Sequence, residues 1–218
     1  MTADNIQQYY DYFKQELKKV DSDGENLRSR ILLVTIIDAL SRAAHPHLAK
    51  KNHDRIVKFI DNYVQWCDRD RVSLPQIKYK LEADSLINGP LYKYVSSTVD
   101  RWQDSMIHDS SVDPLFDSVI NKAQCDCERK IIKISKYKEL FYSHRNYLVH
   151  EYRNPGDGFV GFSQCTGAHY HQHDTRWELV FPVSLFSAFC HDGLSELKNK
   201  LIDEERDPYE SYEFGSKW

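Results

Sequence analysis

Residues 25–44 read ENLRSRILLVTIIDALSRAA, and the apolar run at their centre decides the fold class. The run from Ile31 to Ile37 is apolar enough to be buried on most of its faces. Its β-branched residues would also suit a strand, but the length of the segment and its alanine-rich end favour a helix. His45-Pro46 then breaks the pattern. We therefore expect a central core helix at about residues 25–44.

Helical periodicity continues through most of the chain. Ser73 before Leu74-Pro75, and Pro90 further on, are helix start signals. The other segments with helical spacing are about 5–20, 52–67, 73–82, 90–102, 113–125, 127–151 and 183–202.

The pattern changes between residues 153 and 182. Several glycines occur here, and the alternation of Phe159 and Gly161, followed by the run Trp177-Glu-Leu-Val-Phe181, is typical of short strands. The sequence therefore predicts a mainly α-helical bundle with a small β-hairpin insertion near residues 157–181. We expect a single domain over residues 1–203, followed by an acidic and aromatic tail over residues 204–218.

Composition excludes some classes of protein. No stretch approaches the roughly 20 apolar residues of a membrane span, and the polar start lacks the features of a signal peptide. We therefore expect a cytoplasmic protein with no membrane partner. The net charge of −4 does not by itself indicate nucleic-acid binding. Between residues 129 and 153, however, seven basic and two acidic side chains give a local net charge of +5. This local positive charge favours binding of phosphate groups.

The five cysteines are Cys67, Cys125, Cys127, Cys165 and Cys190. Their odd number and irregular spacing argue against a disulfide framework, so we expect reduced thiols. Cys125-Asp-Cys127 is too tight for the usual zinc pair.

Residues 145–150, Arg-Asn-Tyr-Leu-Val-His, combine a permanent cation with a titratable base on an apolar helical run. Arginine offers donors matched to phosphate oxygens, and histidine exchanges a proton near neutral pH. On a regular helix five residues turn through about 500°, which would place Arg145 and His150 about 140° apart. We therefore expect that one regular helix does not bring them into one compact site.

The Arg-x-x-x-x-His spacing, with Asn directly after Arg, resembles the signature of the HEPN superfamily, small helical domains found in many prokaryotic ribonucleases and toxins. The resemblance implies a HEPN-like bundle and a metal-independent endoribonuclease without a cofactor, in a toxin–antitoxin or anti-phage setting. It also implies a homodimer in which two motif helices face each other across a composite cleft. RNA is then the substrate, and an antitoxin or another regulatory protein is a possible partner.

The resemblance assigns roles to three side chains. His150 would act as general acid or base, Arg145 would neutralise charge on the scissile phosphate, and Asn146 would orient the pair. The nucleophile would be the 2′-hydroxyl of the RNA. The side chains expected to contact RNA nearby are His144, Tyr147, Arg153 and Lys138.

Two other interpretations remain open. Arg145 could simply bind a carboxylate or helix-end carbonyls, with His150 at a helix terminus, in a non-catalytic dimerisation or binding module. Alternatively, residues two apart on a strand face the same side, so His169, His171 and His173 could hold a metal ion in a metal-dependent hydrolase. Strictly alternating histidines are not a standard structural zinc spacing, and a solvated loop is the plainer interpretation.

Overall fold

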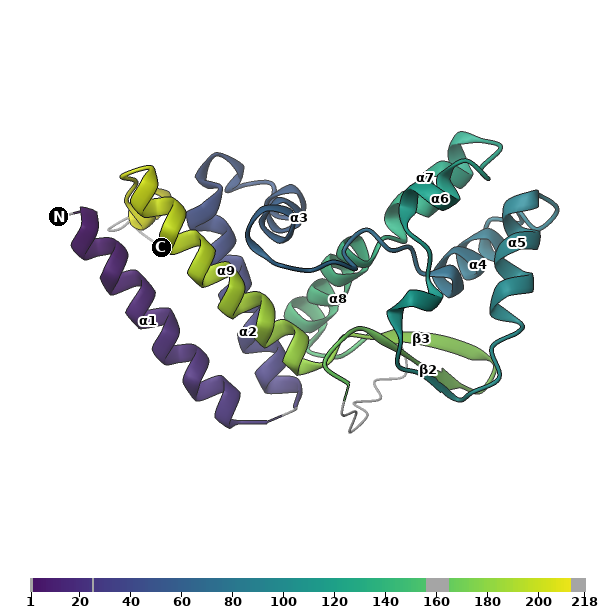
Figure 1. Cartoon of the computed structure of the whole chain (residues 1–218), viewed down its shortest axis with the longest axis horizontal. Helices are drawn as coiled ribbons and strands as arrows, with labels where there is room; N and C mark the ends of the chain where they lie inside the picture. The colour runs from purple at the N-terminus through teal and green to yellow at the C-terminus, as the bar shows by residue number, and fades with distance from the viewer. Residues whose placement is uncertain (1, 25, 156–164, 213–218) are drawn as a thin grey trace. The chain divides into compact units, whose positions relative to one another are not determined.

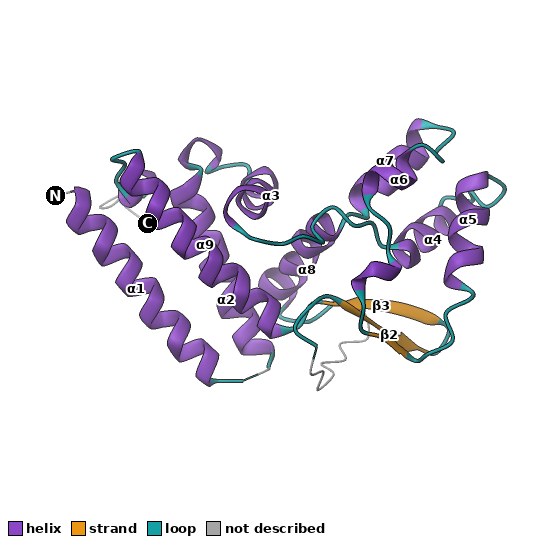
Figure 2. Ribbon diagram, in the orientation of Figure 1, coloured by secondary structure: helices purple, strands orange, loops and turns teal. Residues whose placement is uncertain are grey.

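The computed structural model describes residues 2–24, 26–155 and 165–212. It is mainly helical with a small antiparallel sheet, which confirms the predicted fold class (Figure 1, Figure 2). The described residues form two compact units. Unit 1 falls within Met1–Trp66, Arg145–Phe162 and Val183–Trp218, and unit 2 within Cys67–His144 and Ser163–Pro182. This division does not by itself decide the single domain over residues 1–203, which stays a prediction.

Unit 1 is a bundle in which one helix contacts several others. Its elements are α1 (Thr2–Ser22), α2 (Leu27–Ala44), α3 (Asn52–Tyr63), α9 (Val183–Asp203) and the short 3-10 helices η1 (Pro46–Leu48) and η3 (Pro208–Ser211). α9 packs against α1, α2 and α3 (Figure 1). Leu33, Ile37 and Leu40 of α2 are at most 1% exposed, so the predicted core helix is confirmed. The side chain of Asn26 caps this helix by accepting from the Ser29 N–H at 2.8 Å.

The start of the predicted tail is bound to unit 1. Arg206 Nη1 donates to the Ala43 carbonyl at 2.5 Å, and Asn5 Nδ2 donates to Asp207 at 2.6 Å. The Tyr209 ring lies 5.6 Å from that of Tyr9 on α1. The tail is therefore tied to α1 and α2 up to residue 212, and residues 213–218 lie outside the described part.

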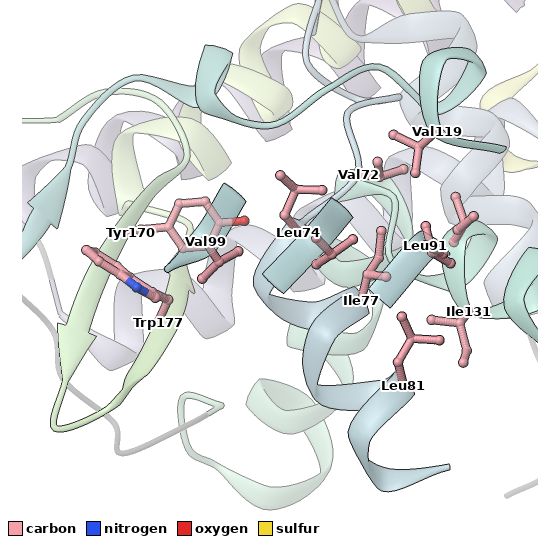
Figure 3. Close-up of a cluster of buried hydrophobic side chains, with 12 residues drawn as sticks. Val72, Leu74, Ile77, Leu81, Leu91, Val99, Val119, Ile131, Tyr170 and Trp177 are labelled. Atoms are coloured by element: carbon pink, nitrogen blue, oxygen red, sulfur yellow. The ribbon is translucent and has the colours of Figure 1, made fainter. Parts of the chain in front are cut away.

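Unit 2 surrounds a separate apolar core. Its helices are α4 (Leu74–Ala83), α5 (Pro90–Val99), η2 (Ser110–Val112), α6 (Phe116–Ile120), α7 (Asp126–Ile134) and the first part of α8 (Tyr137–Glu151). Its strands are β1 (Met106–Ile107), β2 (His169–His173) and β3 (Arg176–Val180), paired antiparallel in that order. Leucine, isoleucine and valine side chains of the helices pack with Tyr170 and Trp177 of the hairpin (Figure 3). The predicted hairpin is confirmed for β2 and β3, whereas the expected alternation at Phe159 and Gly161 falls outside the described residues.

A fully buried carboxylate connects three elements of unit 2. Asp113 is 0% exposed, and its Oδ1 accepts from the Leu74 N–H at 3.0 Å. Its Oδ2 accepts from the hydroxyl of Tyr137 at 2.8 Å and from that of Tyr170. Desolvation by burial raises the pKa of Asp113 to about 6, although these hydrogen bonds oppose the shift. The carboxylate therefore joins the start of α4, the start of α8 and strand β2.

The predicted helix over residues 127–151 is interrupted, so it forms α7 and α8. At the interruption, the backbones of Ser135 and Tyr137 form hydrogen bonds with residues 71–73, and these are not bonds of a helix. The Ser73 N–H donates to the Ser135 carbonyl, and the Tyr137 N–H donates to the Arg71 carbonyl, both at 2.9 Å. These long-range bonds account for the break, because no proline or glycine occurs there.

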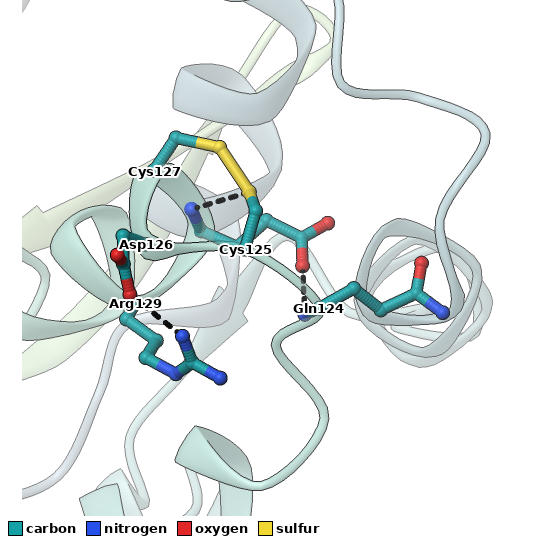
Figure 4. Close-up of a disulfide and its surroundings, with 6 residues drawn as sticks. Gln124, Cys125, Asp126, Cys127 and Arg129 are labelled. Atoms are coloured by element: carbon teal, nitrogen blue, oxygen red, sulfur yellow. Dashed lines mark hydrogen bonds and ion pairs between the residues drawn. A yellow bond between two sulfur atoms is a disulfide. The ribbon is translucent and has the colours of Figure 1, made fainter.

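The expectation that the cysteines are reduced is wrong for one pair. Cys125 and Cys127 form a disulfide at the start of α7 (Figure 4). The sequence argument rejected a disulfide framework from cysteine number and spacing, but a helix start can bring the sulfurs of residues two apart within bonding distance. Cys67 and Cys190 are thiols outside this disulfide, and Cys165 is a thiol whose Sγ contacts His108 Nδ1.

None of the helices within residues 2–24, 26–155 and 165–212 is long and apolar enough to cross a membrane.

Candidate functional site

A carboxylate that the sequence analysis did not single out binds two arginines in unit 1. Asp38 of α2 accepts from Arg55 Nη2 of α3 at 3.0 Å, and its other oxygen forms an ion pair with Arg145 Nη2 of α8. Arg55 is 5% exposed and Arg145 6% exposed. Because buried charges require partners, this carboxylate holds both guanidinium groups in place. Two arginines and one aspartate leave a net charge of +1 on the cluster.

Arg55 fixes the position of the cluster within the bundle. Its Nε donates to Ser41 Oγ at 3.1 Å, and its Nη1 donates to the Ala49 carbonyl at 3.0 Å. Ser41 Oγ in turn donates to the backbone carbonyl of Asp38 at 2.8 Å. Three of its five donors are thus bonded to α2 and to the residue that follows η1, so Arg55 supports Asp38.

The structure brings together the three predicted catalytic side chains. Arg145 Nη1 lies 3.1 Å from Asn146 Oδ1 and 3.4 Å from His150 Nε2. The expectation that one regular helix keeps Arg145 and His150 apart is therefore wrong at the level of their polar atoms. The angle of about 140° describes the directions in which the two side chains point from the helix axis. The arginine side chain is long enough for its guanidinium to reach the imidazole despite that angle. The compact site no longer requires a second chain, and the homodimer stays a prediction.

Arg145 and His150 differ in access to solvent. Arg145 is buried, and its Nε has no hydrogen-bond partner among the described residues, whereas His150 is exposed. A guanidinium can only donate, so a hydrogen bond in this contact requires His150 Nε2 to be the acceptor. The exposed imidazole is thus the part of the site that a ligand reaches first, with one arginine donor directly behind it.

The four side chains expected to contact RNA have other partners. In unit 1, Arg153 pairs with Glu151 at 2.7 Å, and its guanidinium lies 4.6 Å from the centre of the Tyr147 ring. In unit 2, Lys138 pairs with Asp70 at 3.1 Å, and His144 is 4% exposed with its ring against Phe181. Their roles stay predictions, and burial disfavours a phosphate contact by His144.

The local balance of +5 between residues 129 and 153 overstates the free positive charge. Basic side chains of this stretch form ion pairs with carboxylates from elsewhere in the sequence or from the stretch itself. The pairs are Arg129–Asp126, Lys136–Asp70, Lys138–Asp70, Arg145–Asp38 and Arg153–Glu151. Sequence proximity did not show Asp38 and Asp70 as partners, because both are distant in the chain from the stretch.

The alternating histidines do lie on a strand, β2. The rings of His169 and His171 are 5.2 Å apart, and His108, next to β1, stacks on His169 at 6.5 Å. His173 is exposed and lies near Asp174. In the part of the chain that the structure describes, no group of three or more histidine, cysteine or acidic side chains is arranged to hold a metal ion.

Comparison with known proteins adds no identification: no family model matches the chain, and no curated protein and no solved structure matches it significantly.

Proposed function

We propose that this protein is an endoribonuclease of HEPN type that uses His150 and Arg145 to cleave RNA by attack of the 2′-hydroxyl. The observation that carries the proposal is the distance of 3.4 Å between Arg145 Nη1 and His150 Nε2, with Asp38 binding the far side of the same guanidinium. A permanent cation and a titratable base on one small surface are the two groups that this reaction needs. The resemblance of residues 145–150 to the HEPN motif supports the same function.

The reaction begins with binding of a phosphate oxygen to Arg145 Nη1. That oxygen competes with His150 for the donor, so binding releases the lone pair of Nε2. His150 then takes the proton of the 2′-hydroxyl, and the 2′-oxygen attacks the adjacent phosphorus. The bond to the 5′-oxygen breaks, and the imidazolium returns its proton to that oxygen. The products carry a 2′,3′-cyclic phosphate and a 5′-hydroxyl, and DNA is resistant because it lacks the nucleophile.

Asp38 and Arg55 act as positioning residues in this proposal. The Asp38 carboxylate occupies Nη2 of Arg145, which directs Nη1 toward His150. The net charge of +1 on the three side chains leaves the cluster able to attract one phosphate group. Asn146 Oδ1, at 3.1 Å from Nη1, restricts the guanidinium from the other side.

The decisive experiment replaces the exposed histidine. His150→Ala should lower the rate of RNA cleavage by about 100-fold or more, the usual contribution of a general acid–base group. His53→Ala is the matched control, because His53 is an exposed histidine on α3 of the same unit and should leave cleavage unchanged. A DNA strand of the same sequence should remain intact, and cleavage should survive a chelator. Equal cleavage by both variants would refute the proposal.

A non-catalytic binding or dimerisation module is the second candidate, and the burial of Arg145 in an ion pair favours it. In that case the purified protein does not cleave RNA, and Arg145 only stabilises the bundle. RNA that is bound and recovered intact would support this candidate.

The cellular setting belongs to the same proposal. A homodimer, held inactive by an antitoxin or acting in phage defence, is what the HEPN resemblance implies, and the cytoplasmic location is the expectation from sequence composition. Sedimentation of the purified protein tests the dimer.

A further inference from the structure

The disulfide of unit 2 closes a very short loop, since only Asp126 separates Cys125 from Cys127. A disulfide stabilises a fold mainly by restricting the unfolded chain, and this effect grows with the length of the closed loop. The bond therefore contributes little to stability. α7 is held independently by Ile131 and Ile132, which are 4% and 0% exposed in the core. The cysteine pair is thus free to change its redox state without loss of the helix.

The two sulfurs have different surroundings (Figure 4). Cys125 is the N-cap residue of α7, and its Sγ accepts from the Glu128 N–H at 3.3 Å. Cys127 lies in the first turn and is the more exposed of the two. Backbone N–H groups at the start of a helix stabilise a thiolate, so negative charge is favoured on Cys125. Access from solvent is favoured at Cys127.

The two carboxylates beside the pair have partners of their own. Asp126 forms an ion pair with Arg129 at 2.7 Å. Glu128 Oε2 accepts from the Gln124 N–H at 2.5 Å. These contacts reduce the repulsion that a thiolate on Cys125 would otherwise meet.

We propose that Cys125–Cys127 is a reversible thiol–disulfide exchange site for a low-molecular-weight thiol of the glutathione type. The external thiolate attacks Cys127 Sγ and forms a mixed disulfide with it. The Cys125–Cys127 bond breaks, and its electron pair goes to Cys125 Sγ, next to the Glu128 N–H. A second external thiolate attacks the external sulfur of the mixed disulfide and releases Cys127 as a thiolate. Two external thiols are oxidised to their disulfide, and the protein disulfide is reduced to two thiols.

The test uses the full chain in buffers of reduced and oxidised glutathione. Samples are quenched with N-ethylmaleimide, digested and identified by mass spectrometry. The pair should pass reversibly between disulfide and dithiol in the folded protein. The trapped intermediate should carry glutathione on Cys127 and maleimide on Cys125. Cys67, an exposed free thiol, should form a mixed disulfide but no internal one, and the buried Cys190 should stay unmodified.

A variant separates exchange from simple accessibility. Cys125→Ser keeps an oxygen that can cap α7, so the helix should be retained. Cys127 should then accumulate as a mixed disulfide when oxidised glutathione is in excess, because no neighbouring thiolate can expel the glutathione and re-form the internal disulfide. Glutathione found on Cys125 in the wild-type intermediate would overturn the assigned order of attack. A pair that reacts only after denaturation would overturn the proposal itself.

Discussion

The burial of Asp113 leads to a quantitative prediction about stability and pH. Its pKa is raised from 3.8 to about 6 in the folded protein, with desolvation as the main cause. A raised carboxyl pKa means that folding favours the protonated form. The contribution of this shift to the free energy of unfolding is fully present below about pH 3.8 and is lost as the pH rises through about 6. A shift of roughly two pKa units corresponds to about 3 kcal/mol, of which about 2 kcal/mol changes between pH 4 and pH 7.

Asp113→Asn removes the titration and retains a similar shape. The amide oxygen can still accept from the Leu74 N–H, whereas the amide nitrogen replaces the oxygen that binds Tyr137 and Tyr170. That change has a constant effect on stability at every pH. The free energy of unfolding of the variant minus that of the wild type should therefore rise by about 2 kcal/mol from pH 4 to pH 7.

Urea unfolding followed by circular dichroism measures this difference at each pH. Other carboxyl groups cancel in this difference because both proteins contain them. They include Asp70, where burial raises the pKa but hydrogen bonds to lysines lower it further, and Asp100, whose pKa is lowered by hydrogen bonds to Lys78 and Ser96. A difference that does not change with pH would refute the reasoning, since the buried carboxyl would then not titrate with a raised pKa.

Two further substitutions test the packing of unit 1. Gly193→Ala should destabilise the protein by about 1–3 kcal/mol in thermal unfolding, because the added Cβ would overlap the buried ring of Phe59. Gly167→Ala is its control, with no atom within 4 Å of the added Cβ, and an equal loss in both would contradict the argument. Asp38→Asn should lower the free energy of unfolding by about 3 kcal/mol, since two buried guanidinium groups lose their carboxylate. The exposed Asp54→Asn should be nearly neutral, and a neutral Asp38→Asn would show that the two ion pairs do not stabilise the bundle.

Helices were well predicted where their signals are local. The expected helix at about 25–44 is α2 at Leu27–Ala44, and Ser73 and Pro90 stand at helix starts as expected. The break between α7 and α8 was missed because its cause is hydrogen bonding to residues 71–73. Similarly, β1 is only two residues long and is a strand only through its pairing with β2.

The candidate site was predicted in part. The motif residues were visible as a short pattern, but their geometry was not, because a helical angle does not describe the end of a long side chain. Asp38 and Arg55 had no signal of their own, since both resemble ordinary polar residues on amphipathic helices. A buried Arg145 requires a carboxylate partner, but the sequence does not show which carboxylate lies beside it.

By itself the sequence determined the helical class, most helix boundaries and the grouping of Arg145, Asn146 and His150 on one segment. These follow from hydrophobic period, capping and chain breakers, which act over a few residues. Only the tertiary structure decided that Asp38 binds Arg145, 107 residues away, and that Asp113 is buried among hydroxyls from other elements. Such partners depend on which faces of distant helices pack together, because that packing decides which polar groups lie beside a buried charge.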